Sequence, residues 1–280
     1  MKYWLYLTSL VFLISTIFVW SRMVAAEGSV LKIAFLDVGQ GDAIYIEAPN
    51  GNQVLVDAGP GRQVLRALGT VMPFGDRSLD LIIATHPDAD HIGGFPEVLK
   101  RYQVGAVMES GVRSDTSIDR AFGEAVAAEG AVRVAARRGE RVVLGRGAYL
   151  DILFPDGEVS GWETNTASIV ARLVYGENEF LLTGDSPIKI ERYLLGLDGA
   201  KLEADVLKAG HHGSRTSSAP EYVAAVHPDY AIISAGKNNR YGHPHQEVID
   251  VFNKFGATIL RTDELGTIIF ESDGLNLTLL

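Results

Sequence analysis

The ten residues Thr85–Gly94, with the sequence THPDADHIGG, crowd four potential metal ligands into one short segment. These ligands are His86, Asp88, Asp90 and His91. The apolar run Leu81–Ala84 precedes them, so they follow the end of a buried strand, where α/β proteins place ligands. The glycine pair Gly93-Gly94 comes next and permits sharp backbone geometry. We favour a two-metal site, with ions about 3.5–4 Å apart, over a helix N-cap beside solvated aspartates.

The composition describes a globular domain with a restricted choice of metal ligands. The chain has 280 residues, of which 47% are apolar and 21% are charged, so we expect a sizeable core. It contains no cysteine, which leaves His, Asp and Glu as the strong ligands. The formal net charge of −10 argues against binding to nucleic acid mainly through charge. A nucleic-acid role would therefore rest on a local site with bound cations.

The N-terminal segment predicts export. The run Tyr3–Trp20 is uncharged and strongly apolar, and its length of about 18 residues lies between a signal-peptide core and a bilayer span. Val24 and Ala26 suit a cleavage site. We expect residues 1–26 to be a signal peptide or a membrane anchor and residues 27–280 to form one domain. That domain would be extracytoplasmic, either secreted or associated with the membrane through the apolar run.

Strands and helices alternate along the rest of the chain. Strands are predicted at residues 79–84, 179–182 and 205–208, each running into a potential ligand. Residues 131–154 have the pattern of a β meander. The simplest architecture is one domain of two packed sheets with helices outside.

The remaining histidines also cluster in polar, glycine-rich segments. Six of the seven histidines form three tight groups, two of them in AGHHGSRTSS and NNRYGHPH. Only His227 stands apart, at a predicted helix end before a proline, where a capping role fits best. Asp185, in LLTGDS, precedes a predicted helix and on its own would be an N-cap. Beside a two-metal site, it is the carboxylate that could bridge both ions.

Six motifs resemble one family in their order along the chain. They are LDVGQGDA (Leu36–Ala43), VDAGP (Val56–Pro60), THPDADHIGG, LTGD (Leu182–Asp185), LKAGHHGSRTSS (Leu207–Ser218) and SAGKNNRYGHPH (Ser234–His245). Together they resemble the metallo-β-lactamase superfamily and, more finely, the hydrolase domain of ComEC-type DNA-uptake proteins, over roughly residues 30–275. The resemblance implies an α/β fold, the four-layer αββα sandwich, with the site at one edge between the sheets.

The resemblance also implies a ligand set for two divalent ions. One ion would be held by His86, Asp88 and Asp185, with Asn165 as a further candidate. The other would be held by Asp90, His91, Asp185 and one histidine of the His211/His212 pair, for which we favour His212. His211 would then face the phosphate or support a ligand. His243 would touch the scissile phosphate, with His245 supporting it.

Two departures from the general superfamily signature make the site harder in the Lewis sense. Asp88 stands where the common HxHxDH signature has its second histidine, and no histidine lies between His91 and His211. Asn165 occupies about the place of the missing one. Oxygen donors shift preference from Zn²⁺ toward Mn²⁺ or Mg²⁺, so we expect Mn²⁺ first, with Zn²⁺ as the alternative.

The expected chemistry is attack of a metal-activated water on phosphorus. Catalytic roles are assigned to Asp90, His211 and His243. Substrate contacts are assigned to Asn165, Ser214, Lys237, Asn238, Arg240 and His245. Supporting positions beside the ligands are assigned to Asp37, Gln40, Asp42 and Asp57. For Gln40 and Asp42, simple turn chemistry is nearly as good an explanation.

The predicted function is a metal-dependent phosphodiesterase or nuclease that acts on DNA outside the cytoplasm in competence. The chain has one apolar segment, so it would act alone or beside a separate channel protein. The alternatives are a hydrolase of small or cell-surface phosphoesters, of lactones or of β-lactams, and a non-catalytic binding module. The sequence does not define an oligomeric state.

Overall fold

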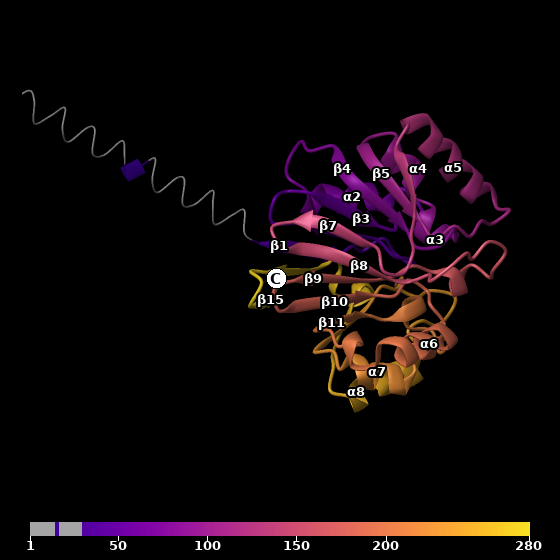
Figure 1. Cartoon of the computed structure of the whole chain (residues 1–280), viewed down its shortest axis with the longest axis vertical. Coiled ribbons are helices and arrows are strands. Elements are labelled where there is room, and N and C mark those ends of the chain that lie inside the picture. Colours follow the sequence, from indigo (N-terminus) through magenta and orange to yellow (C-terminus); the bar gives the residue numbers. More distant parts are fainter. Residues whose placement is uncertain (1–14, 17–29) are drawn as a thin grey trace, which may run out of the picture.

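The computed structural model describes residues 15, 16 and 30–280 (Figure 1). Two β sheets pack face to face, and helices cover the outer face of each sheet (Figure 1). The predicted four-layer αββα sandwich is therefore confirmed.

The first sheet has the strand order β15-β14-β1-β2-β3-β4-β5-β6. Its strands are β1 (Leu31–Phe35), β2 (Ile44–Glu47), β3 (Gln53–Val56), β4 (Ser78–Ala84), β5 (Gln103–Glu109), β6 (Val132–Ala135), β14 (Ile268–Ser272) and β15 (Leu277–Leu279). Strands β3 to β6 run parallel, and the other neighbours are antiparallel. The last four residues of β4 are buried, because this strand lies inside the sheet with helices on one face and the second sheet on the other.

The second sheet has the order β13-β12-β11-β10-β9-β8-β7. Its strands are β7 (Arg141–Gly145), β8 (Ala148–Phe154), β9 (Val170–Tyr175), β10 (Asn178–Leu182), β11 (Val206–Lys208), β12 (Tyr230–Ile233) and β13 (Thr258–Arg261). Strands β10 to β13 run parallel, so their carboxyl ends meet at one edge of the sheet.

Helices form the two outer layers. The first sheet is covered by α2 (Gln63–Val71), α4 (Phe95–Leu99) and α5 (Ser117–Glu129), and the short α3 (Ala89–Ile92) follows β4. The second sheet is covered by α6 (Ile188–Asp198), α7 (Pro220–Val226) and α8 (Gln246–Lys254). The short α9 (Thr262–Leu265) precedes β14. In Figure 1 these two sets of helices lie on opposite sides of the paired sheets.

Phenylalanines join the two sheets at the centre of the core. The Phe270 ring on β14 lies 6.4 Å from the ring of Phe35 on β1 and 6.2 Å from that of Phe180 on β10. Both contacts are edge-to-face, the favoured geometry of aromatic pairs. The sheets therefore share one apolar core that fixes their edges relative to each other.

The predicted β meander over residues 131–154 is wrong. β6 pairs in parallel with β5 in the first sheet, whereas β7 and β8 belong to the second. The helix α5 makes the crossover that a parallel pair requires. The strand itself was predicted at these residues, but all four are exposed, so their side chains do not indicate which sheet it joins.

The predicted signal peptide or anchor at residues 1–26 falls outside the described residues, apart from residues 15 and 16. Within the described part of the chain, no helix has the length and apolar character needed to cross a membrane. The N-terminal segment stays a prediction.

Candidate metal centre

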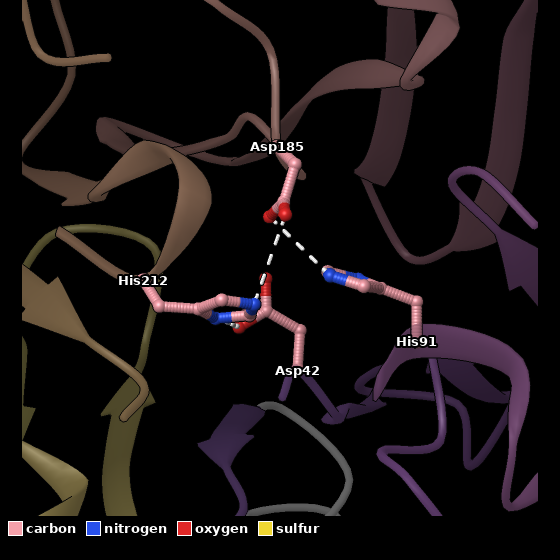
Figure 2. Close-up of side chains that lie close together, drawn as sticks. All are labelled: Asp42, His91, Asp185 and His212. Atoms are coloured by element: carbon pink, nitrogen blue, oxygen red, sulfur yellow. Dashed lines mark ion pairs between the residues drawn. The ribbon is translucent and has the colours of Figure 1, made fainter. Parts of the chain in front are cut away.

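Segments from both sheets meet at one site. The carboxyl end of β4 leads into His86 and α3, and the end of β10 leads into Asp185. The end of β11 leads into the His211-His212 pair, and the loop between β1 and β2 supplies Asp42. Figure 2 shows Asp42, His91, Asp185 and His212 pointing toward one another from these separate segments. The four offer ligand atoms that all lie within 4.8 Å of one another.

Three buried imidazoles are fixed through their Nδ1 atoms. The Nδ1 partners of His86, His91 and His212 are Thr85 Oγ1 at 3.0 Å, Asp57 Oδ2 at 2.7 Å and the Ser234 carbonyl at 3.0 Å. Asp57 is itself held by the backbone N–H and hydroxyl of Thr85. Such partners fix ring orientation and basicity in metal sites, and Asp57 lies where it could act in this way on His91.

The Nε2 atoms of the same three histidines face the centre. Neither these atoms nor Asp185 Oδ1 have a hydrogen-bond partner within the described residues, although all are buried. Unpaired buried polar atoms are costly, and their convergence here suits a cation that accepts their lone pairs. The donor set therefore fits divalent metal.

Asp185 lies between the two implied groups of ligands. On one side, His86 Nε2 is 3.9 Å from Asp185 Oδ2 and 3.8 Å from Asp88 Oδ2. On the other side, His91 Nε2 is 3.3 Å from Asp185 Oδ1, and His212 Nε2 is 3.7 Å from Asp185 Oδ2. A carboxylate in this position can bridge two ions. The alternative role as a helix cap does not apply, because the N-cap of α6 is Pro187.

Asp90 completes the second group of donors. Its Oδ2 lies 3.3 Å from His212 Nε2, and its side chain keeps 32% of its exposure. The Asp88 side chain is similarly accessible at 38%. These two carboxylates therefore border solvent, whereas the histidines and Asp185 form the buried floor.

The two neighbouring histidines His211 and His212 play different structural parts. Both have positive φ, 49° and 55°, in the left-handed region that non-glycine residues seldom adopt. His212 is buried, whereas His211 has a side chain 27% exposed and held at Nδ1 by Thr216. His211 Nε2 still lies 3.5 Å from Asp185 Oδ2. This geometry suits the predicted assignment, with His212 as ligand and His211 at the substrate side.

A buried lysine at this centre was missed from the sequence. Lys208 has no exposure, and its Nζ lies 2.8 Å from Asp42 Oδ2 and donates to the Ala209 carbonyl at 2.9 Å. Asp42 Oδ1 is also 3.3 Å from His212 Nδ1. Asp42 Oδ1 has no hydrogen-bond partner within the described residues, so Asp42 lies against His212 with one oxygen still able to contact a cation. The signal was a charged residue ending the short apolar strand before the histidine pair.

Burial and charge pairing set opposite pKa shifts in the cluster. Burial by itself would raise the pKa of Asp185, but His91 and His212 outweigh it and hold this pKa well below its usual value. Burial would lower the pKa of His212, but Asp185 and Asp42 raise it to about 9. Burial, followed by repulsion from His91, lowers the pKa of His86 to about 4. Metal would thus displace protons from His91 and His212, making its affinity pH-dependent.

His243 lies beside the His211-His212 pair. Its ring is 5.6 Å from that of His211 and 6.3 Å from that of His212. Burial, followed by repulsion from His212, lowers its pKa to about 4, so the imidazole is neutral near pH 7. The ring of His245, the N-cap residue of α8, is 5.0 Å away, and its Nδ1 accepts the backbone N–H of Arg215. His245 thus supports the loop that carries His243.

The other predicted positions lie around the centre with mixed roles. Gln40 Oε1 accepts the Gly236 N–H, which ties the two loops together, whereas Asp37 makes a local turn by accepting the Gly39 N–H. Ser214 Oγ accepts from Thr216. Asn165 begins a 3₁₀ turn. Ser168, the residue that follows this turn, accepts a hydrogen bond from the Asp185 N–H. Lys237 and Asn238 line a pocket with His243, and Arg240 lines another with Asp90.

The role assigned to the glycine pair needs correction. Gly93 and Gly94 have ordinary helical dihedrals, with φ of −61° and −83°. What requires glycine is close approach, because a Cβ on Gly94 would lie 2.1 Å from the Ala58 carbonyl oxygen. The pair allows α3 to sit against the loop after β3. That loop includes Asp57, which fixes His91.

Comparison with known sequences gives this site a family. The Metallo-beta-lactamase superfamily matches residues 36–237, which is more than half of the chain. The chain belongs to the metallo-β-lactamase superfamily. The matched region includes the complete donor set described above.

Similar bacterial proteins bear competence names. The chain is 34% identical over 255 residues to ComE operon protein 3 of Bacillus subtilis, covering 85% of this chain and 32% of that protein. It is 33% identical over 253 residues to competence protein ComA of Neisseria gonorrhoeae, covering 90% and 34%. The predicted resemblance to ComEC-type proteins is confirmed, and the chain spans about a third of the length of these relatives.

Solved structures share the fold at low sequence identity. CmlA, a diiron β-hydroxylase from Streptomyces venezuelae, matches with a TM-score of 0.55 and 15% identity, over 89% of this chain and 54% of that one. Zn²⁺-bound PqqB from Methylobacterium extorquens matches with a TM-score of 0.51 and 13% identity, over 79% and 85%. These likenesses support the fold alone.

Proposed function

We propose that this protein is a metal-dependent phosphodiesterase with a dinuclear site, acting on DNA as a nuclease. The observation that carries the proposal is the convergence of three unpaired histidine Nε2 atoms on one buried carboxylate, Asp185. Two further carboxylates border the same centre from the solvent side. Such a floor and rim suit an anionic substrate that approaches bound cations.

The donor set supports hard divalent ions. His86, Asp88 and Asp185 would hold one ion, and Asp90, His91, Asp185 and His212 the other. Carboxylate oxygens supply half of the six ligating residues, which favours Mn²⁺, with Zn²⁺ as the alternative. When bound, two such ions supply hydroxide near neutral pH and offset the charge that develops on a phosphoryl group.

The residues of the chain divide the remaining work. Asp57 and the Ser234 carbonyl hold the rings of His91 and His212 in place. The neutral His243 would donate a hydrogen bond to a non-bridging or leaving oxygen of the phosphate, and His211 would contact the same group. Lys237 and Arg240 precede His243 on the same loop and would attract the neighbouring phosphates.

The alternative substrates of this fold fit less well. β-Lactam and lactone hydrolysis by this superfamily would be favoured by Zn²⁺ and imidazole-rich ligation, whereas this site carries three aspartates. A small or cell-surface phosphoester would use the same centre and is the second candidate. A binding module without turnover does not explain the two carboxylates left accessible to solvent.

Action outside the cytoplasm, beside a separate channel protein, is part of the same proposal. It rests on the apolar run Tyr3–Trp20 and on the competence names of the relatives. Retention of an epitope-tagged chain in spheroplasts after protease treatment would contradict the extracytoplasmic location.

The deciding experiment measures cleavage of single- and double-stranded DNA by the full chain with Mn²⁺, Zn²⁺ or Mg²⁺. Asp90→Asn removes a ligand charge and should abolish cleavage, whereas Asp250→Asn on the exposed face of α8 is the matched control and should retain it. Hydrolysis of bis-p-nitrophenyl phosphate without DNA cleavage would move the substrate to the second candidate. Inactivity toward both substrates with every metal would overturn the proposal.

A further inference from the structure

A pocket of about 500 Å³ opens beside the metal centre, and of its lining residues the proposed reaction uses only Asp90 and Arg240. Asp90 is one of its lining residues, and the Asp90 carboxylate reaches the centre at His212 Nε2, 3.3 Å away. The apolar part of its lining comes from Val38, Pro60, Ala89 and Tyr241, and the side chains of Gln40, Gln63, Asn239 and Arg240 supply polar groups. A cavity with apolar walls directly beside a polar, charged centre is suited to a substrate that has both kinds of surface.

Tyr241 is the aromatic wall of this pocket. Its side chain is 48% exposed, although it belongs to a well-anchored loop. Asn239 Oδ1 accepts the backbone N–H groups of Tyr241 and His243, and Asn239 Nδ2 donates to the Gly236 carbonyl at 2.9 Å. These hydrogen bonds anchor the loop, and Tyr241 lines the pocket from it.

Two side chains extend the Tyr241 ring into a platform. The Arg240 guanidinium carbon lies 4.8 Å from the ring centroid, and Arg240 donates to the Tyr241 hydroxyl at 2.7 Å. The His243 ring lies 5.6 Å from the Tyr241 ring at an interplanar angle of 23°. His243 in turn lies 6.3 Å from the ring of His212. A chain of rings therefore leads from the pocket to the metal centre.

The chemistry of this platform selects one class of group. Aromatic rings and guanidinium planes stack on nucleobases, and such stacking tolerates any base. A quaternary ammonium, such as choline, would be repelled by the positive charge of Arg240 over the only aromatic wall that the described residues give this pocket. A flat heterocycle has apolar faces for Val38 and Pro60, and polar edges for Gln40 and Asn239.

We propose that this pocket binds the nucleobase next to the scissile phosphate, with Tyr241 and Arg240 as its stacking platform. The inference rests on the proposed function, because it takes the phosphate to lie at the metal centre. It goes further in naming the substrate as a nucleic-acid strand with an unpaired base at the cut. The pocket would then favour single strands over intact duplex, where bases are stacked on one another.

The test compares binding of two oligonucleotides of equal charge to the full chain. One is a fluorescein-labelled phosphorothioate pentathymidylate, and the other is the same backbone with abasic residues. The wild type should bind the first roughly 5- to 150-fold more tightly, as expected for stacking of one base. Tyr241→Ala should remove most of this difference, and Tyr241→Phe should keep it. Tyr193→Ala, at an exposed tyrosine of α6, is the matched control and should change nothing.

Equal binding of both oligonucleotides by the wild type would overturn the inference, and this comparison needs no variant to fold. An undiminished difference in folded Tyr241→Ala would overturn the role of the platform. DNA cleavage by the wild type is measured in parallel. Cleavage of DNA without tighter binding of the base-containing oligonucleotide would support the nuclease proposal and contradict the proposed base-binding pocket. Tighter binding of the base-containing oligonucleotide that depends on Tyr241, without any DNA cleavage, would support the base-binding pocket and contradict the nuclease proposal.

Discussion

Replacing Lys208 by methionine tests how much the buried ion pair between Lys208 and Asp42 contributes to the free energy of unfolding. Lys208 and Asp42 are both almost without exposure, and their charged atoms lie 2.8 Å apart. Methionine has a similar length and fills the same space without charge. The substitution therefore leaves the Asp42 carboxylate buried, next to a single remaining partner, His212 Nδ1, at 3.3 Å.

The expected cost follows from this geometry. Removing one partner of a buried ion pair costs about 3–5 kcal/mol, because the other charge stays without compensation. We expect the lower end, about 3 kcal/mol, since His212 still contacts Asp42 and its pKa is raised to about 9. The double variant Lys208→Met/Asp42→Asn removes both charges and should recover most of the loss.

Urea denaturation of metal-free protein at pH 7 measures these free energies of unfolding. A loss of about 3 kcal/mol lowers the midpoint by roughly 1–3 M when the m-value is about 1–3 kcal/mol per M. Lys189→Met, at an exposed lysine of α6, is the matched control and should shift it little. A Lys208→Met variant within 1 kcal/mol of wild type, or a double variant as unstable as the single one, would refute this account.

Three further changes address the supports of the site. Asp57→Asn leaves His91 Nδ1 without its carboxylate and should weaken metal binding by about 10- to 100-fold in a chelator competition assay, and unchanged affinity would contradict its supporting role. Burial raises the pKa of Glu191 to about 7 from 4.5, so the native state keeps a proton that the unfolded chain releases, and stability should fall by about 3 kcal/mol as pH rises through that window. Urea denaturation at pH 5 and pH 8 should show this loss of unfolding free energy in wild type and little of it in Glu191→Gln. An equal change in unfolding free energy between the two pH values for both proteins would contradict this explanation. Gly94→Ala would place a Cβ 2.1 Å from the Ala58 carbonyl oxygen and should lower stability by about 1–3 kcal/mol in thermal melts, and an unchanged melting temperature would show that the contact relaxes freely.

Local patterns predicted much of the fold. The continuous apolar run Leu81–Ala84 is buried on both faces in β4, so its period and composition sufficed to place the ligand segment at a strand end. The same reasoning assigned β6 to the wrong sheet. Its residues are exposed, and the crossover through α5 determines that it pairs with β5. Which sheet a short edge strand joins is a long-range property.

For the candidate site too, the sequence predicted what is local and missed what depends on contacts between distant segments. Residues grouped in the sequence, such as His86 and His91, could be placed together from their spacing. Lys208 could not, because its partner Asp42 is distant along the chain and only folding brings the pair within 2.8 Å. The reason for glycine at Gly94 was also hidden, because it lies in contact with Ala58 and not in the dihedral angles of the residue itself.

The direction of β1 sets which way the centre faces relative to the start of the folded domain. β1 begins at Leu31 and runs toward the loop that carries Asp42, so the first described strand residue lies at the opposite end of the strand from the centre. Five residues of strand span about 17 Å. If the chain is held on a support by what precedes Leu31, the reactive edge is turned outward, away from the point of attachment. If the protein were immobilised through this side, its metal centre would remain accessible to long polymers in solution.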